Sequence, residues 1–205
     1  MKKGILLLSL IIIVFLVSGF SDSINTLNKK LNFSNKISKV PTEEESILLE
    51  YNIPFVGKSY TGFKEAVAFK ESQGQYDVVN ELGYLGKYQF GKSTLKRFKI
   101  YNSQEFLANP ELQEEAFIAL CSLNKWILRK DIQRSIGKNI NGIEITESGI
   151  LAAAHLAGAG NVKKYLRSNG ETSFKDAFGS SVEHYLEHFS GYDTSFIKAS
   201  KKPVI

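Results

Sequence analysis

Residues 63–91 read FKEAVAFKESQGQYDVVNELGYLGKYQFG, and the rest of the chain is organised around this stretch. Its first part has helical periodicity, because Phe63, Val67 and Glu71 recur at every fourth position and share one helix face. Helix-forming residues end at Gln73 and Gly74, which places Glu71 in the last turn of the predicted helix. An acidic residue therefore continues an apolar stripe at the C-terminal end of a helix.

This position disfavours the ionised form of the Glu71 carboxyl group. The C-terminal end of a helix carries partial negative charge, and apolar neighbours exclude water, so both effects raise the pKa. A carboxylic acid that stays protonated near neutral pH is suited to general acid catalysis. Taken alone, a glutamate at a helix end is more often an ordinary exposed residue, so the loop that follows matters.

The loop after this helix is rich in glycine, tyrosine and amide side chains. Tyr84, Tyr88 and Gln89 lie there, with Gly83 and Gly86 between them. Aromatic faces with hydrogen-bonding tips suit sugar rings, which have apolar CH faces and equatorial hydroxyl groups.

Three short motifs resemble those of the soluble lytic transglycosylases and goose-type lysozymes, which cleave the glycan strands of bacterial peptidoglycan. Glu71 and Ser72 match the family's Glu-Ser at the end of a helix, and residues 86–89 match its Gly-x-x-Gln. Residues 154–158 match its Ala-x-x-x-Gly turn. The separation between Glu71 and Gln89 is also the one that the family uses, and the resemblance covers roughly residues 58–192.

Two positions depart from the family pattern. The family's Tyr-Asn pair in the third motif is His155-Leu156 here, and its Leu-Met pair before the glutamine is Lys87-Tyr88. These departures affect which sugars are bound, and how, more than the identity of the acid.

The resemblance implies a mainly α, lysozyme-like multi-helix domain with a cleft. It also implies cleavage of the β-1,4 bond between N-acetylmuramic acid and N-acetylglucosamine by a single catalytic glutamate, Glu71, with a 1,6-anhydro product. Motif positions assign glycan binding to several residues, and chemistry alone adds Tyr84 and His155. The expected substrate-binding set is Ser72, Tyr84, Gly86, Tyr88, Gln89, His155 and Gly158.

Two other functions stay open. A hydrolase (muramidase) needs a second carboxylate, as nucleophile or as base for a water, and Asp77 and Glu81 are the nearby candidates. Neither lies in a motif that fixes its geometry. The other alternative is a non-catalytic glycan-binding module, because a fold can be kept when its activity is lost.

The N-terminus has the order of a secretory signal. Residues 1–21 read MKKGILLLSLIIIVFLVSGFS, with two lysines, an apolar run and then small residues. The apolar residues also fit an uncleaved membrane anchor, but no cysteine follows them, which excludes a lipoprotein anchor. We therefore expect an exported protein of the periplasm or cell envelope, with residues 1–21 removed or kept as an inner-membrane tether.

The remaining chain divides into a tether, one domain and a tail. Residues 22–57 contain an Asn-, Ser- and Lys-rich tether and a short helix, which a capping box at Thr42 and Glu45 predicts. The catalytic domain is expected over 58–192 and a C-terminal tail over 193–205. Pro110 after Asn109 predicts the start of a long central helix, and Thr146 predicts the cap of another. Strand alternation is short and no repeat is visible, so the fold class is mainly α.

Composition excludes several classes. Without Lys2 and Lys3 the chain has 24 basic and 21 acidic residues, an excess too small to indicate nucleic-acid binding but compatible with an anionic wall polymer. The single cysteine, Cys121, cannot form a disulfide within the chain.

Two further motifs are declined, and no metal, nucleotide or other cofactor is expected. Residues 86–93 fit the P-loop pattern, but no buried strand precedes them, and an exported protein meets no ATP. His184 and His188 have the spacing of an inverted zinc-protease motif. A third ligand is needed, and Asp193 is the only acidic residue that follows them.

Overall fold

The computed structural model of the chain describes residues 57–205. The predicted signal segment at 1–21, and the tether and short helix predicted within 22–57, lie outside these residues except for Gly57. The described part is mainly α, which confirms the predicted fold class, and only two strands of two residues each accompany its helices. No helix in residues 57–205 has the length and apolar character that a membrane span requires.

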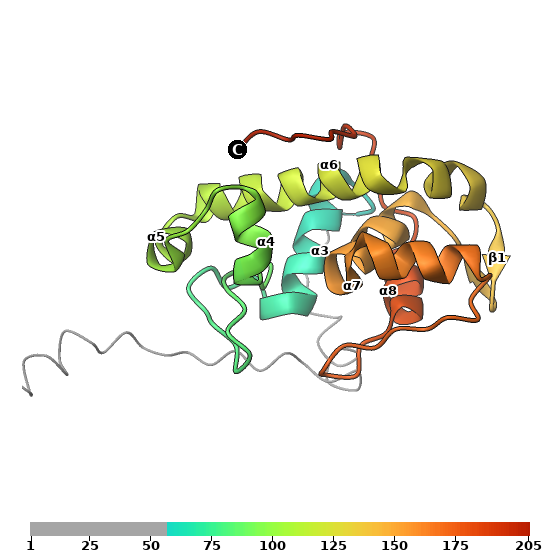
Figure 1. Cartoon of the computed structure of the whole chain (residues 1–205), viewed down its shortest axis with the longest axis horizontal. Helices are drawn as coiled ribbons and strands as arrows, with labels where there is room; N and C mark the ends of the chain where they lie inside the picture. Colours follow the sequence, from blue (N-terminus) through green and yellow to red (C-terminus); the bar gives the residue numbers. More distant parts are fainter. Residues whose placement is uncertain (1–56) are drawn as a thin grey trace, which may run out of the picture. The chain divides into compact units, whose positions relative to one another are not determined.

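Helix α3 (Tyr60–Ser72) is the helix predicted to carry Glu71 (Figure 1). The side chain of Ser59 caps its first turn by accepting a hydrogen bond from the Gly62 amide. Gln73 ends the helix in the left-handed conformation at φ 58°. The prediction that Glu71 lies in the last turn is therefore confirmed.

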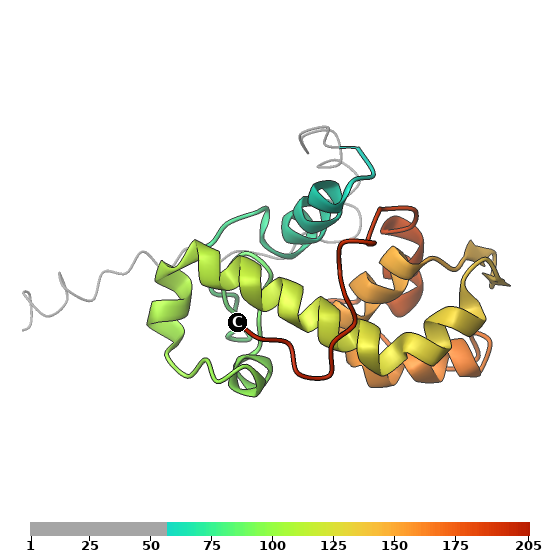
Figure 2. The same cartoon turned by 90° about the horizontal axis from the view of Figure 1, so that it is seen from above.

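Helix α6 (Pro110–Ser135) is the long central helix, and Asn109 caps it as predicted by accepting a hydrogen bond from the Leu112 amide. Helix α3 lies beside α6 (Figure 2). The rings of Phe63 and Phe117 join the two helices at 6.1 Å between centroids. The face of α6 predicted to be buried is buried, with Phe117, Leu120, Cys121, Asn124 and Leu128 each at most 8% exposed.

Helix α7 (Glu147–Arg167) packs against α6 and against α8 (Val182–His188). Thr146 caps α7 as predicted, through a hydrogen bond from the Gly149 amide. The helix is interrupted at Gly158, where φ is 76° and ψ is 149°. A short antiparallel hairpin of β1 (Asn139–Ile140) and β2 (Ile143–Glu144) precedes it.

Two short helices, α4 (Lys92–Arg97) and α5 (Ser103–Ala108), connect the loop after α3 to α6. The pair Ser93-Thr94 predicts the cap of a short helix through Phe98. That cap is wrong, because α4 begins at Lys92, after Gly91, and has no side-chain cap. Ser93 and Thr94 therefore lie inside the first turn of α4.

Part of the segment expected to be a C-terminal tail packs on the helices. Thr194 and Ile197 are buried, and the Ser200 amide donates a hydrogen bond to the Ser122 carbonyl of α6. In Figures 1 and 2 this segment runs along α6.

Two loops matter for the site. Residues 73–91 follow α3, and residues 168–181 connect α7 to α8. Both loops extend on the side of the structure opposite α6 (Figure 1).

Candidate active site

Two adjoining pockets lie between these loops and helices α3, α6, α7 and α8. The first has a volume of about 100 Å³ and contains Glu71 in its wall. The second has a volume of about 450 Å³ and extends along the kinked part of α7. Four residues line both pockets, which places the pockets next to each other: Tyr84, Gln89, His155 and Leu156.

Glu71 is the titratable group whose environment fits general acid chemistry. Its side chain is only 8% exposed, and its Oε1 accepts a 2.8 Å hydrogen bond from the hydroxyl group of Tyr185. Burial raises the pKa of Glu71 to about 7; the Tyr185 hydrogen bond opposes this, and the nearby charge of Asp176 adds to it. The raised pKa expected from the sequence is confirmed, and loss of water is its main cause.

Tyr185 was missed as a site residue. It lies on α8, in the segment that was considered only for its two flanking histidines. Tyr185 is 1% exposed. The hydroxyl oxygen is the only polar atom of its side chain, and it donates its hydrogen bond to Glu71. A buried tyrosine needs such a partner, but nothing within a few residues of Tyr185 identifies it.

Asp176 is a second acidic residue in the wall of the first pocket, and it was also missed. Its Oδ1 accepts hydrogen bonds from the amides of Phe178 and Ser180, at 2.9 and 2.8 Å, in the loop before α8. The Asp-x-x-Gly pattern that ends at Gly179 is typical of such a turn. It predicts the turn but not its position beside Glu71.

Asp77 and Glu81, the acids considered for a hydrolase, are exposed and line neither pocket. A hydrolase mechanism needs a second carboxylate near Glu71. Asp176 lies in the same pocket wall as Glu71, whereas Asp77 and Glu81 do not.

The structure brings four of the predicted binding residues to the pockets. Tyr84, Gln89 and His155 line both, with Tyr84 the most exposed of them at 42%. Gly158 lines the second pocket, at the break in α7 that the Ala-x-x-x-Gly motif predicted.

Three predicted binding residues are not brought to either pocket. Ser72 is fully buried, and its hydroxyl donates a 2.8 Å hydrogen bond to the Lys87 carbonyl. Tyr88 is also fully buried and stacks on Phe117, with ring centroids 4.1 Å apart. Gly86 has a positive φ of 70° and lies against the side chain of Gln113. Each of these residues has a contact within the protein.

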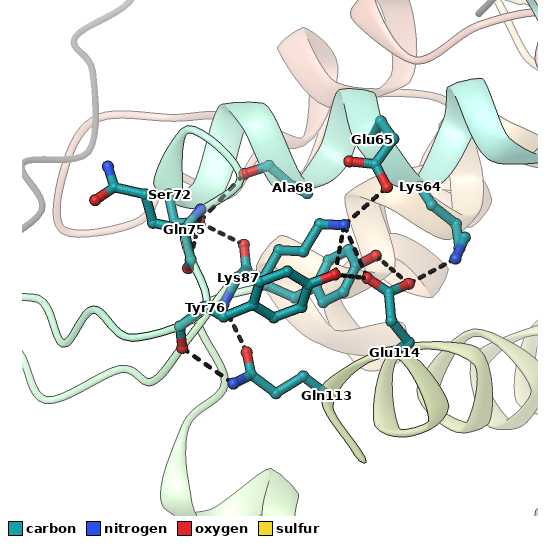
Figure 3. Close-up of polar contacts among 10 residues, drawn as sticks. Lys64, Glu65, Ala68, Ser72, Gln75, Tyr76, Lys87, Gln113 and Glu114 are labelled. Carbon is teal, nitrogen blue, oxygen red and sulfur yellow. Dashed lines mark hydrogen bonds and ion pairs between the residues drawn. The ribbon is translucent and has the colours of Figure 1, made fainter. Parts of the chain in front are cut away.

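A partly buried ion network holds the loop that carries Gln89 (Figure 3). The ammonium group of Lys87 lies 2.7 Å from Glu65 and 2.8 Å from Glu114, and the Lys87 side chain is only 5% exposed. Burial raises the pKa of Glu114, but hydrogen bonds from its neighbours outweigh this effect and lower the pKa to about 2. The donors to Glu114 are Lys64, Lys87, Tyr76 and Tyr88.

Both the backbone amide and the backbone carbonyl of Lys87 are hydrogen-bonded to side chains. Its amide donates a 2.8 Å hydrogen bond to Gln113, and its carbonyl accepts one from Ser72 (Figure 3). The network therefore connects the end of α3, the start of α6 and the loop between them.

The two declined motifs have structural accounts. The residues before Gly86 form only isolated β-bridges, and the helix after the P-loop pattern, α4, has six residues. His184 and His188 stack on each other with centroids 5.5 Å apart. Within residues 57–205, no group of three His, Cys, Asp or Glu side chains is arranged to hold a metal ion.

Comparisons with known proteins identify no relative. No family model, curated protein or solved structure was found to match the chain. The site itself combines a buried acid whose pKa burial raises to about 7, a second acid in the same wall, and an adjoining pocket lined by aromatic, amide and imidazole groups.

Proposed function

We propose that this chain is a peptidoglycan lytic transglycosylase with a lysozyme-like arrangement of its helices. It cleaves the β-1,4 bond between N-acetylmuramic acid and N-acetylglucosamine and leaves a 1,6-anhydro end on the muramic residue. The observation that carries the proposal is Glu71, a buried carboxyl with a pKa of about 7 in the wall of a pocket. No cofactor takes part, and the substrate is the glycan strand of the cell envelope.

The reaction uses one carboxyl group twice. Protonated Glu71 donates its proton to the bridging oxygen as the glycosidic bond breaks, and the acetamido group of the substrate stabilises the oxocarbenium ion. Ionised Glu71 then accepts the proton of the muramic 6-hydroxyl, whose oxygen attacks the anomeric carbon and closes the anhydro ring. Glu71 is protonated again at the end, so the cycle needs no water.

Tyr185 orients the acid for this cycle. Its hydroxyl group donates a hydrogen bond to Oε1 of Glu71. Within residues 57–205, this is the only hydrogen bond that the carboxyl group receives. Oε2 is then the oxygen that carries and exchanges the proton. A phenol donor also stabilises the ionised form that exists between the two proton transfers.

The adjoining pockets suit a polymer better than a single small molecule. They follow one another along the wall that Tyr84, Gln89 and His155 share, and Glu71 lies in the first. The exposed rings of Tyr84 and Phe178, 42% and 43% exposed, offer faces for sugar rings. A strand that occupies both pockets would pass Glu71.

The direct test compares Glu71→Gln with Glu81→Gln on purified peptidoglycan, with released fragments identified by mass spectrometry. We expect Glu71→Gln to fold and to release no fragments, because an amide cannot donate the proton. Glu81 is exposed and outside both pockets, so Glu81→Gln should release fragments with anhydro ends like the unmodified chain. A Glu71→Gln protein with full activity would refute the proposal.

A muramidase is the second candidate, and Asp176 favours it because it lines the same pocket as Glu71. In a hydrolase, Asp176 would act as nucleophile or as base for a water, and the products would have reducing ends. Asp176→Asn would then abolish cleavage. In the transglycosylase mechanism the same variant keeps activity and anhydro products, with a changed pH dependence.

A further inference from the structure

The wall between the two pockets contains two hydrogen-bond acceptors that receive no hydrogen bond from any residue in 57–205. They are Oε1 of Gln89 and Nδ1 of His155, both buried and both without a partner in this described part of the chain. Gln89 and His155 are also among the few residues that line both pockets. A buried acceptor that is left unpaired costs free energy, so such pairs of atoms need an explanation.

Neighbouring backbone carbonyls determine the orientation of the Gln89 amide and the tautomer of His155. The side-chain nitrogen of Gln89 donates a 2.8 Å hydrogen bond to the Gly86 carbonyl, which can only accept. The atom on the other branch of the amide is therefore the oxygen. In the same way, Nε2 of His155 lies 2.8 Å from the Tyr88 carbonyl and must carry a hydrogen.

The second nitrogen of His155 then has a free lone pair. Burial lowers the pKa of His155 to about 4, so the ring is neutral near pH 7 and Nδ1 carries no hydrogen. The ring is also held in place, with its edge or face against Phe90 and Phe117 at centroid distances of 5.7 and 5.5 Å. Nδ1 cannot turn toward another donor without loss of both ring contacts and the Tyr88 hydrogen bond.

We propose that Gln89 and His155 form an acceptor pair that binds O–H and N–H donors of the ligand, namely sugar hydroxyl groups and the acetamido N–H of an N-acetylated glycan. The pair selects against ligand groups that offer only lone pairs at this wall, such as carboxylates and phosphates, because lone pairs repel each other. This inference rests on the proposed function for the identity of the ligand as a glycan strand. It assigns to His155, a departure from the family pattern, a specificity role that follows from its tautomer.

Two substitutions at His155 separate its two nitrogens. His155→Gln places an amide nitrogen where Nε2 lies, which keeps a donor for the Tyr88 carbonyl but removes the acceptor at Nδ1. His155→Asn places an oxygen near Nδ1 and removes the donor at Nε2. We expect affinity for soluble glycan strands, freed of stem peptides by an amidase, to fall about tenfold in His155→Gln and by less than about threefold in His155→Asn. Both are made in the Glu71→Gln chain, so that the strands are not cleaved during the titration.

The nitrogen resonances of the imidazole give a readout that does not depend on activity. The full chain has three histidines, so ¹⁵N-histidine labelling gives a small set of signals, and His155→Gln identifies those of residue 155. We expect the Nδ1 signal of His155 to start in the range of an unprotonated nitrogen and to move upfield when the glycan strands are added. This change reports a hydrogen bond received by Nδ1.

The outcomes separate this inference from the proposed function. Glycan binding with an unchanged Nδ1 signal, together with equal affinity in His155→Gln, would overturn the acceptor pair even if the chain cleaves peptidoglycan. A moving Nδ1 signal in the Glu71→Gln chain, found together with an unmodified chain that releases no fragments from peptidoglycan, would support the acceptor pair and refute the transglycosylase. Equal loss of affinity in His155→Gln and His155→Asn would also count against the pair, because it would mean that only ring packing matters.

Discussion

The hydroxyl group of Tyr185 donates a 2.8 Å hydrogen bond to Oε1 of Glu71 across 114 positions of the chain. The two side chains come from helices α8 and α3, and both are buried. Burial favours the neutral form of Glu71, whereas the phenol donor favours the ionised form. The acid is therefore held near the pKa at which it can both give and take a proton at neutral pH.

Under the proposed function, the pH dependence of peptidoglycan cleavage should follow the ionisation of Glu71. The first step needs the protonated carboxyl, and the pKa of Glu71 is raised to about 7. Initial rates measured from about pH 5 to about pH 9 should be half-maximal near pH 7 on the alkaline side. A rate that stays constant up to about pH 9 would mean that another group is the acid.

Tyr185→Phe and Asp176→Asn should move the alkaline limb of the pH–rate profile, where the rate falls as the pH rises, in opposite directions. Loss of the Tyr185 donor removes the interaction that lowers the pKa of Glu71, so the limb moves to higher pH. Loss of the Asp176 charge removes an interaction that raises this pKa, so the limb moves to lower pH. The rate profile of each variant tests its shift, and shifts in the same direction would contradict the assigned electrostatics.

Glu71→Gln should stabilise the protein at alkaline pH. The pKa of Glu71 rises from 4.5 to about 7 on folding, so below pH 4.5 the carboxyl is neutral in both states and costs nothing. As the pH rises to about 7, only the unfolded state loses its proton, and stability falls by up to about 3 kcal/mol. Urea unfolding of both proteins at about pH 4 and about pH 8.5 checks this. A difference between the proteins that does not change with pH would contradict the raised pKa.

Two glycine substitutions should differ in cost. Both Gly158 and Gly86 have positive φ, but a Cβ added at Gly158 meets no atom within 4 Å, whereas one at Gly86 meets the side chain of Gln113. Gly158→Ala should lose about 1 to 3 kcal/mol through backbone strain alone, because φ 76° with ψ 149° is a conformation that is essentially restricted to glycine. Gly86→Ala should lose at least about 3 kcal/mol, since strain and overpacking add. Equal midpoints in urea would show that the Gln113 side chain moves away without cost.

Removal of the Lys87 charge should destabilise the protein strongly. Lys87→Met removes the ammonium group that Glu65 and Glu114 share and leaves Lys64 as the remaining cation on Glu114, which costs about 2 kcal/mol for hydrogen bonds between charged groups. Arg134→Met is the control, because its side chain is 58% exposed and its ion pair with Asp131 contributes less than about 1 kcal/mol. Chemical unfolding measures both, and a Lys87→Met loss as small as the Arg134→Met loss would contradict the importance of the network.

Much of the helical structure followed from sequence signals that act within a few residues. The periodicity that ends at Gln73 located α3 and put Glu71 in its last turn, and Asn109 and Thr146 marked the starts of α6 and α7. The turn of the Ala-x-x-x-Gly motif is the break in α7 at Gly158, where φ is positive. Helix caps and glycine conformations depend on local backbone geometry, so a single sequence contains them.

The direction in which loop side chains point did not follow from the sequence. Tyr84 and Tyr88 lie four residues apart in the same loop, yet Tyr84 is 42% exposed at the pockets and Tyr88 is fully buried on Phe117. A loop has no period from which to infer which of two tyrosines faces inward. Tyr88 faces inward because its hydroxyl group bonds to Glu114 of α6, within the ion network that also contains Lys87 and Glu65 of α3.

The sequence by itself determined where α3 ends and where α6 and α7 begin, and that an acid lies at the end of α3 among apolar residues. Only the tertiary structure decided that Tyr185 would hold this acid, that Asp176 and not Asp77 or Glu81 would share its pocket, and that His155 would keep a free lone pair beside it. The physical reason is distance along the chain. Caps and helix periods are set by neighbours within one or two turns, whereas these contacts join residues that only the packing of α3, α7 and α8 brings together.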